Sequence, residues 1–137
     1  MDYKKLYIEL GNLLYAVAKA DGHVQAEEKT ALRSIVKNEL APLEPSIDAF
    51  GSDKAFYTEF EFETLEAADI PYQEALKSFI NYVHTHQSIF NDQLIKLTFD
   101  AVKHIANAYK GTTEMETEII DQLNEEFKVI KANNSKK

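Results

Sequence analysis

Residues 6–22 read LYIELGNLLYAVAKADG, and this stretch decides the fold class. Its leucines and valine stand at positions 6, 10, 13, 14 and 17, a spacing of i, i+4, i+7, i+8 and i+11. Residues at these intervals share one face of an α-helix. We therefore expect an amphipathic helix from about Tyr3 to Ala20, which Asp21-Gly22 ends.

Apolar residues with helical spacing recur along the rest of the chain and predict four further helices. Proline and capping residues set the expected ends of these helices. The expected ranges are 26–40, followed by Pro42 and Pro45; 71–86, with Pro71 as its first residue; 91–109, with Asn91 as its N-cap; and 114–130.

The stretch from Ser46 to Ile70 has no clear helical pattern. Within it, Glu59-Phe60-Glu61-Phe62-Glu63 alternates with the period of a strand. A lone strand would have no partner strand in this sequence. We expect a loop followed by an irregular or short helix.

The composition indicates one globular domain. The 137 residues are 45% apolar and include eight Phe and seven Tyr, so the chain can bury a core. Only four Gly and three Pro are available for turns, which favours helices over a β-sandwich. We predict an all-α, compact single-domain bundle of about five to seven helices over residues 1–131, with a frayed tail over residues 132–137.

The net charge of -8 comes from 23 acidic and 15 basic residues. This sign opposes binding to nucleic acid. The acids concentrate between Lys54 and Lys77 and between Lys110 and Lys128. Two interpretations stay open for these segments: a solvated face, or a surface for cations or a basic partner.

The chain has no cysteine, which excludes disulfides, thiol nucleophiles and thiolate metal sites. Its first residues show no cleavage pattern, and no apolar run is long enough to cross a bilayer. We expect a cytoplasmic protein without membrane insertion.

The first turn and its flanking residues are similar in sequence to a segment later in the chain. With an offset of 88 residues, alanines, one glutamate and two apolar residues coincide, which predicts two pseudo-symmetric helix-turn-helix hairpins. Thr113 and Glu116 have the spacing of a capping box, whereas Gln25 is a poorer cap and leaves Glu28 its half of the box. The coinciding pairs are Ala18 and Ala106, Ala20 and Ala108, Glu28 and Glu116, Leu32 and Ile120, and Ile35 and Leu123.

The same turn also suggests a metal site. Asp21, Glu27 and Glu28 gather near one helix start beside His23, and hard divalent cations such as calcium or magnesium take oxygen ligands. The spacing is not that of an EF-hand loop, so further acids such as Glu116 would have to contribute. Capping and metal binding both remain open as roles for these acids.

The pattern small-x-small-Asp21-Gly22-x-Val24 followed by Glu28, between two apolar helices, resembles the TerB-like family. That family includes a protein of bacterial tellurite-resistance operons and a domain of a DnaJ-type co-chaperone. The resemblance covers about residues 13–36 and implies an all-helical, stress-related binding module. It also implies that Asp21 and Glu28 bind a divalent metal, with Glu116 as the matching acid. The second half has Tyr109-Lys110 where the family often repeats Asp-Gly.

No motif of a nucleophilic serine, a phosphate-binding loop or a zinc helix occurs, so we expect a non-enzymatic adaptor. His84 and His86 lie two residues apart and cannot chelate one ion as an i, i+4 pair. One alternative is a metal-free protein-interaction or homodimerisation domain. Another is a metal-dependent hydrolase with a deep pocket at Asp21, His23 and Glu28. The interaction surface would consist of exposed aromatic residues: Phe56, Tyr57, Phe60 and Phe62.

Overall fold

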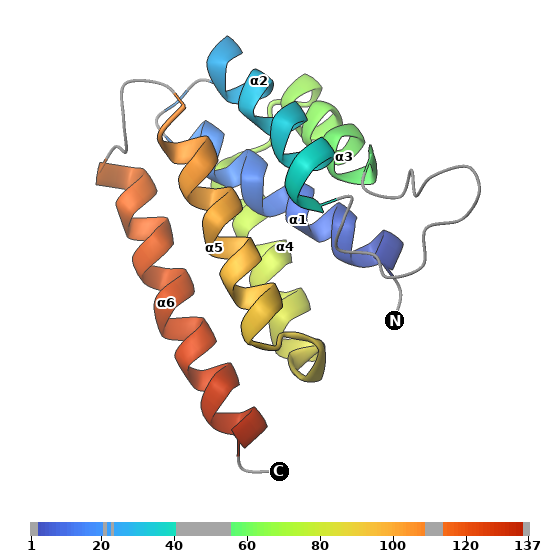
Figure 1. The fold of residues 1–137 in the computed structure, drawn as a ribbon. Coiled ribbons are helices and arrows are strands. Elements are labelled where there is room, and N and C mark those ends of the chain that lie inside the picture. Colours follow the sequence, from blue (N-terminus) through green and yellow to red (C-terminus); the bar gives the residue numbers. More distant parts are fainter. Residues whose placement is uncertain (1–2, 21, 23, 41–55, 109–113, 136–137) are drawn as a thin grey trace, which may run out of the picture.

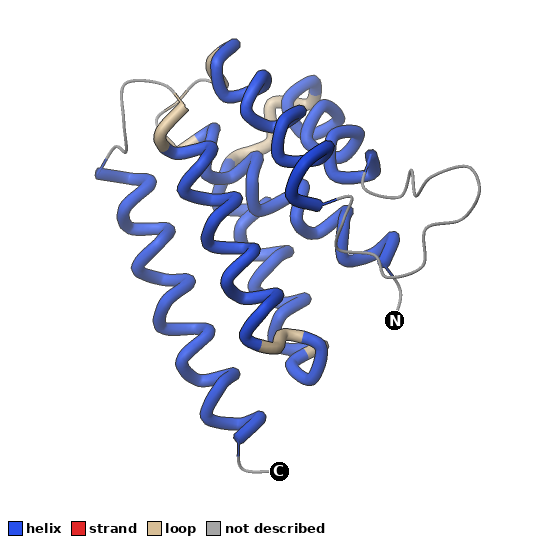
Figure 2. Tube along the Cα trace, in the orientation of Figure 1, coloured by secondary structure: helices blue, strands red, loops and turns tan. Residues whose placement is uncertain are grey.

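The computed structural model describes residues 3–20, 22, 24–40, 56–108 and 114–135. These residues form six α-helices and no strand (Figure 2). The predicted all-α bundle of five to seven helices is therefore confirmed. The helices are α1 (Tyr3–Lys19), α2 (Ala26–Ile35), α3 (Phe56–Ala67), α4 (Tyr72–Thr85), α5 (Asp92–Ala106) and α6 (Glu114–Ser135); a π-helical turn, η1 (Val36–Leu40), extends α2, and a 3₁₀ turn, η4 (Gln87–Ile89), follows α4.

Helix α1 lies at the centre of the bundle and packs against α3, α4, α5 and α6 (Figure 1). The stripe predicted from the sequence is buried completely, and most of the other side of the helix is buried as well. A helix that is buried on all sides must be apolar around most of its circumference. Tyr7, Tyr15 and Ala16 complete this burial outside the stripe.

Gly11 allows α1 to approach α3 closely. A Cβ atom at this position would lie 2.7 Å from the backbone oxygen of Thr58 and 2.9 Å from the Cβ atom of Glu61. The Thr58 hydroxyl also donates a hydrogen bond of 2.7 Å to the backbone oxygen of Tyr7. The missing side chain at Gly11 permits this close approach, and the hydrogen bond from Thr58 to Tyr7 requires it. Together they hold α1 and α3 in one relative position.

The alternating stretch of acids and phenylalanines is part of a regular helix, α3, and not an irregular one. Phe62 is fully buried, and its ring lies edge-on to that of Tyr15 at 5.6 Å between centroids. Phe60 is 65% exposed. The period of two therefore reflects one buried and one exposed phenylalanine on a helix, and the described residues contain no strand with which this segment could pair. The loop expected before α3 lies outside the described residues.

The C-terminal half of α6 is anchored by aromatic side chains. The Phe127 ring lies 5.6 Å from that of Phe90 and 5.5 Å from that of Phe99, measured between centroids. Phe90 also meets Phe79 of α4 at 6.3 Å. Aromatic pairs at these distances add to the stabilisation that comes from burial itself. The second half of α6 is thus tied to α4, to η4 and to α5.

Several predicted helix ends need correction. Helix α6 continues to Ser135, five residues past the predicted end at Ile130, so residues 132–135 are helical and not frayed. Asn133 and Asn134 donate hydrogen bonds to Gln87, which explains this extension. Pro71 is the N-cap of α4 and not its first residue. Asn91 caps α5 as predicted, since its side chain accepts the Leu94 amide proton at 2.8 Å.

Candidate functional site

The acidic residues predicted as a metal site lie at the starts of α2 and α6. Glu28 is the third residue of α2 and only 2% exposed, and Glu116 is the third residue of α6 and only 1% exposed. Glu27, beside Glu28, is exposed. The two buried glutamates thus have the same position within their helices, and the pseudo-symmetric pair of hairpins remains a prediction.

Glu28 acts as a helix cap. Its Oε1 atom accepts the backbone N–H of Gln25 at 2.7 Å, the glutamate half of a capping box. The positive end of the α2 dipole stabilises a carboxylate here as well. The capping role predicted for Glu28 is therefore present. The corresponding box between Thr113 and Glu116 involves residue 113, which lies outside the described residues.

The structure does not bring Glu27, Glu28 and Glu116 together as a metal centre. Within the described ranges, no three Asp, Glu or His side chains lie close enough to hold a metal ion. Asp21 and His23 lie outside those ranges, so the larger set of Asp21, Glu27, Glu28 and Glu116 remains a prediction. The predicted hydrolase pocket at Asp21, His23 and Glu28 also includes these two residues and likewise remains a prediction.

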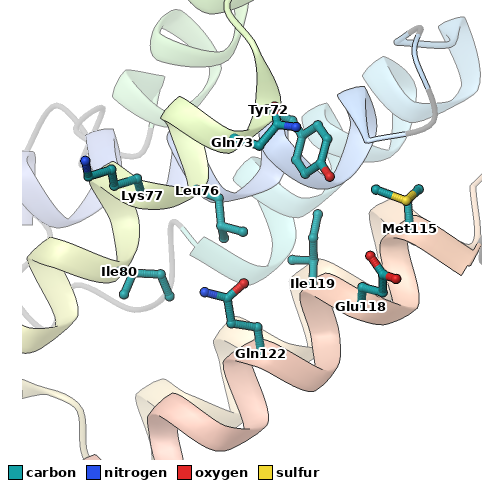
Figure 3. Close-up of a pocket in the computed structure, with 9 residues that line it drawn as sticks. All are labelled: Tyr72, Gln73, Leu76, Lys77, Ile80, Met115, Glu118, Ile119 and Gln122. Carbon is teal, nitrogen blue, oxygen red and sulfur yellow. The ribbon is translucent and has the colours of Figure 1, made fainter.

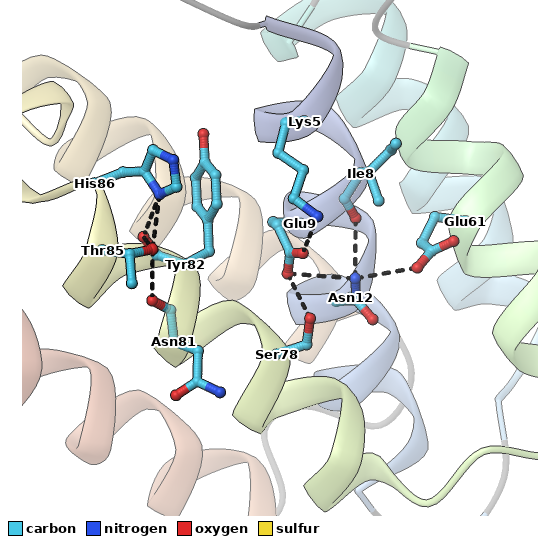
Figure 4. A network of polar contacts seen from close by, with 10 residues as sticks. All are labelled: Lys5, Ile8, Glu9, Asn12, Glu61, Ser78, Asn81, Tyr82, Thr85 and His86. Carbon is cyan, nitrogen blue, oxygen red and sulfur yellow. Dashed lines mark hydrogen bonds and ion pairs between the residues drawn. The ribbon is translucent and has the colours of Figure 1, made fainter.

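His84 of α4 and His86, the C-cap of that helix, make structural contacts. The Nε2 atom of His84 lies 2.5 Å from Oε2 of Glu126, a contact that joins α4 to α6. The ring of His86 stacks on Tyr82 with 4.2 Å between centroids, and its Nδ1 atom lies 2.8 Å from the hydroxyl of Thr85 (Figure 4). The two side chains therefore serve different contacts.

Three of the four aromatic residues predicted for an interaction surface are exposed on α3. Phe56 is 49% exposed, Tyr57 36% and Phe60 65%. Residues three or four positions apart are neighbours on a helix, so these side chains form one continuous surface, here called the α3 aromatic face. Phe62 was predicted to belong to it, and this prediction is wrong: Phe62 points into the core against Tyr15.

A groove of about 330 Å³ lies between α4 and α6 (Figure 3). Its apolar residues include Leu76 and Ile80 from α4 and Met115 and Ile119 from α6. Sequence reasoning did not find it, because a groove depends on how far two helices stand apart. The acidic segment between Lys110 and Lys128 was the available signal, since Glu118 of that segment lines the groove.

A buried polar network also escaped prediction. Asn12 of α1 donates to Glu61 of α3 at 3.1 Å and to Glu9 at 3.4 Å, while the hydroxyl of Ser78 on α4 donates to Glu9 at 2.8 Å (Figure 4). Lys5 lies 3.5 Å from the second oxygen of Glu9. Glu9 and Asn12 are three residues apart amid apolar residues of α1, which was the visible signal. The network links three helices in one arrangement.

No helix in the described part of the chain is long and apolar enough to cross a membrane. Comparison of the chain with protein-family models, with curated proteins and with solved structures found no match.

Proposed function

We propose that this chain is a non-enzymatic protein-binding module, a stress-related adaptor of the TerB-like kind acting in the cytoplasm, and that the α3 aromatic face binds its protein partner. One observation carries the binding role: the aromatic rings of Phe56, Tyr57 and Phe60 are exposed next to one another. Aromatic residues are the commonest energetic centres of protein interfaces. The TerB-like and stress-related parts rest on the sequence resemblance and on the equivalent positions of Glu28 and Glu116.

The charges beside the α3 aromatic face indicate what kind of partner it takes. Glu59 and Glu63 flank the rings. Further along α3, Glu66 forms an ion pair of 2.8 Å with Lys29 of α2. Lys4 of α1 places its Nζ atom 5.0 Å from the centre of the Tyr57 ring. A second copy would bring its own acids against these acids, whereas a partner with an apolar pocket and a basic rim would complement them. We therefore favour a basic partner protein over homodimerisation.

Paired variants test this proposal. The double variant Phe56→Ser/Phe60→Ser removes the two exposed phenylalanines, and Val129→Ser removes a valine that is 51% exposed on α6 as a matched control. Proteins captured by the immobilised wild type from a lysate of the source organism are identified, purified and titrated by calorimetry. We expect the double variant to bind at least about tenfold more weakly, because interface aromatics are often worth more than about 1.4 kcal/mol each. Val129→Ser should bind as the wild type does.

Equal affinity of all three proteins would contradict the proposal. Analytical ultracentrifugation of the wild type and the double variant distinguishes a homodimer from binding to a different protein. A wild-type dimer that the double substitution converts to a monomer would mean that the α3 aromatic face binds a second copy, and the basic partner would then be abandoned.

A further inference from the structure

We propose that the groove between α4 and α6 is a second docking site, and that its occupant is an amphipathic helix of a partner protein with basic residues along one flank. This inference is independent of the α3 aromatic face, because the groove is built from different helices. A module with two such surfaces can join two proteins.

The contact between His84 and Glu126, which joins the two helices of the groove, lies beyond the groove residues in both helices. Residues 72–80 of α4 face residues 115–122 of α6 across the groove. Further along, His84 contacts Glu126 at 2.5 Å, and Asn133 donates to Gln87 at 2.9 Å. Phe127, the next residue after Glu126, is buried with its ring against that of Phe90. Because these contacts follow the groove residues in both segments of the chain, α4 and α6 run in the same direction, and the groove lies toward their N-terminal ends.

The floor and walls of the groove are mainly apolar. Leu76 and Ile119 are buried at its base, and Ile80, Tyr72 and Met115 are half-buried along its walls (Figure 3). The volume of about 330 Å³ is near the lower end of the range of roughly 300–1,000 Å³ for small-molecule pockets. An elongated apolar groove of this size between two helices suits a row of aliphatic side chains from a peptide.

The charge around the groove favours a basic occupant. Four exposed acids of α6 follow the spacing i, i+4, i+7 and i+11, so they form one stripe along the helix. Glu118 of this stripe lines the groove, and Lys128 lies 3.6 Å from another member, Glu125. On the α4 side the rim carries Lys77 and Gln73. A basic flank would therefore lie over α6. The stripe consists of Glu114, Glu118, Asp121 and Glu125.

The form of the occupant follows from the walls. A groove between two helices accepts the ridge of a third helix, whose apolar residues at i, i+3, i+4 and i+7 insert between the walls. The part of the chain that the structure describes has no strand whose edge could pair with an extended peptide. A second copy of this chain is a poor occupant, because its net charge of -8 would be repelled by the acidic stripe.

A synthetic peptide can serve as the probe. It contains only leucine and lysine over about five helical turns, with leucines at i, i+3, i+4 and i+7 and lysines elsewhere. One control peptide has the same composition in scrambled order, and a second replaces every lysine with glutamate. Fluorescence anisotropy measures affinity, and amide chemical shifts of the isotope-labelled full chain locate the bound peptide.

Three variants test the groove itself. Ile80→Lys and Met115→Lys each place a charge on one wall, so the test survives if one of them fails to fold. Glu118→Lys/Asp121→Lys reverses two charges of the stripe. Its control is Glu59→Lys/Glu63→Lys, which makes the same change in net charge on α3, away from the groove. Circular dichroism verifies the fold of every variant before binding is measured.

We expect saturable binding of the amphipathic peptide, with shift changes concentrated in residues 72–80 and 115–122. Each wall variant should weaken binding about tenfold or more, and the α6 charge variant should weaken it and flatten its salt dependence, unlike the α3 charge variant. The proposal is overturned if binding does not saturate, if the scrambled or acidic peptide binds equally well, if the shifts map to α3, or if the two charge variants weaken binding equally. Such a result would leave the proposal for Phe56 and Phe60 intact, since those variants do not touch the groove.

Discussion

Lys19 and Asp69 join the ends of two helices: the Nζ atom of Lys19 lies 2.7 Å from Oδ1 of Asp69 and 3.0 Å from the backbone oxygen of Gly22. Asp69 has a φ of 53°, and the hydrogen bonds from Ile70 to Leu65 and from Asp69 to Glu66 close the end of α3 in a Schellman arrangement. One ammonium group therefore links the turn after α1 to the turn after α3.

Because of this link, the stability of the folded protein should fall at alkaline pH. The hydrogen bond to Asp69 raises the pKa of Lys19 above the ordinary lysine value of 10.5. Because the pKa of Lys19 is higher in the folded than in the unfolded chain, its contribution to stability is complete at a pH below the unfolded pKa. This contribution is lost as the pH rises through the pKa of the folded protein. Lys19→Met should lower the melting temperature at neutral pH and reduce its further decline at alkaline pH. Thermal melts across this pH range provide the measurement.

A matched lysine serves as the control for Lys19. The pKa of Lys96 is also raised by a hydrogen bond to an aspartate, Asp100, but both residues lie on α5 and are largely exposed. Lys96→Met should therefore change the melting temperature less than Lys19→Met. Burial raises the pKa of Tyr15, so a residual alkaline decline is expected in every variant. Identical pH profiles for Lys19→Met and the wild type would show that the link contributes nothing.

Gly11→Ala should destabilise the protein although alanine is the better helix former. The new methyl group would lie 2.7 Å from the Thr58 oxygen, so α1 and α3 would have to separate, at a cost of about 1–3 kcal/mol. Asn124→Ala at an exposed position of α6 is the control, and it should be neutral or stabilising by a few tenths of a kcal/mol. Urea unfolding measures both changes. A Gly11→Ala protein as stable as the control variant would mean that the two helices do not meet closely here.

The buried network predicts a coupling between Glu9 and Asn12. Asn12→Leu removes a donor from a buried carboxylate and should cost about 2 kcal/mol or more. Glu9→Leu should cost a similar amount, because the Ser78 hydroxyl and the Asn12 amide lose their acceptor. The double variant should be more stable than the sum of the two losses predicts, by about 1 kcal/mol. Additive losses in denaturant titrations would show that the two side chains act independently.

Capping by Glu28 predicts a difference between two adjacent acids. Glu28→Ala should cost about 1–2 kcal/mol, because the buried cap is lost, whereas Glu27→Ala at an exposed position should change stability by less than about 0.5 kcal/mol. Glu28→Gln keeps an acceptor and should cost less than Glu28→Ala. Thermal or urea unfolding without added metal measures these values. Equal losses at the two positions would contradict the capping role.

The metal hypothesis for Asp21, Glu27, Glu28 and Glu116 makes a separate prediction. A divalent ion at a hundredfold excess over its Kd would stabilise the folded chain by about 2.7 kcal/mol. Asp21→Asn should reduce this gain while leaving the melting temperature in EDTA nearly unchanged. Melts in EDTA, magnesium and calcium give the comparison. If the ions leave the wild-type midpoint unchanged, the four acids are to be explained by turn and cap chemistry alone.

Local chemistry explains why the sequence predicted the helices well. The stripe of α1, the cap at Asn91 and the half-box at Glu28 each depend on residues a few positions apart, and all three are present. Such short-range rules act before any tertiary contact forms. The same reasoning located the starts of α2 and α6 and thereby the buried acids Glu28 and Glu116.

Tertiary structure decided what short-range patterns leave open. Phe60 and Phe62 have the same neighbours in sequence, but only Phe62 meets Tyr15, so packing alone assigned one to the core and one to the surface. Asn133 and Asn134 extend α6 because Gln87 is near them in space. The α4–α6 groove and the network at Glu9 exist only once whole helices are placed together. Composition and periodicity determine which segments become helices, because those signals are local; which faces meet depends on side chains distant in sequence, and only the folded chain brings them into contact.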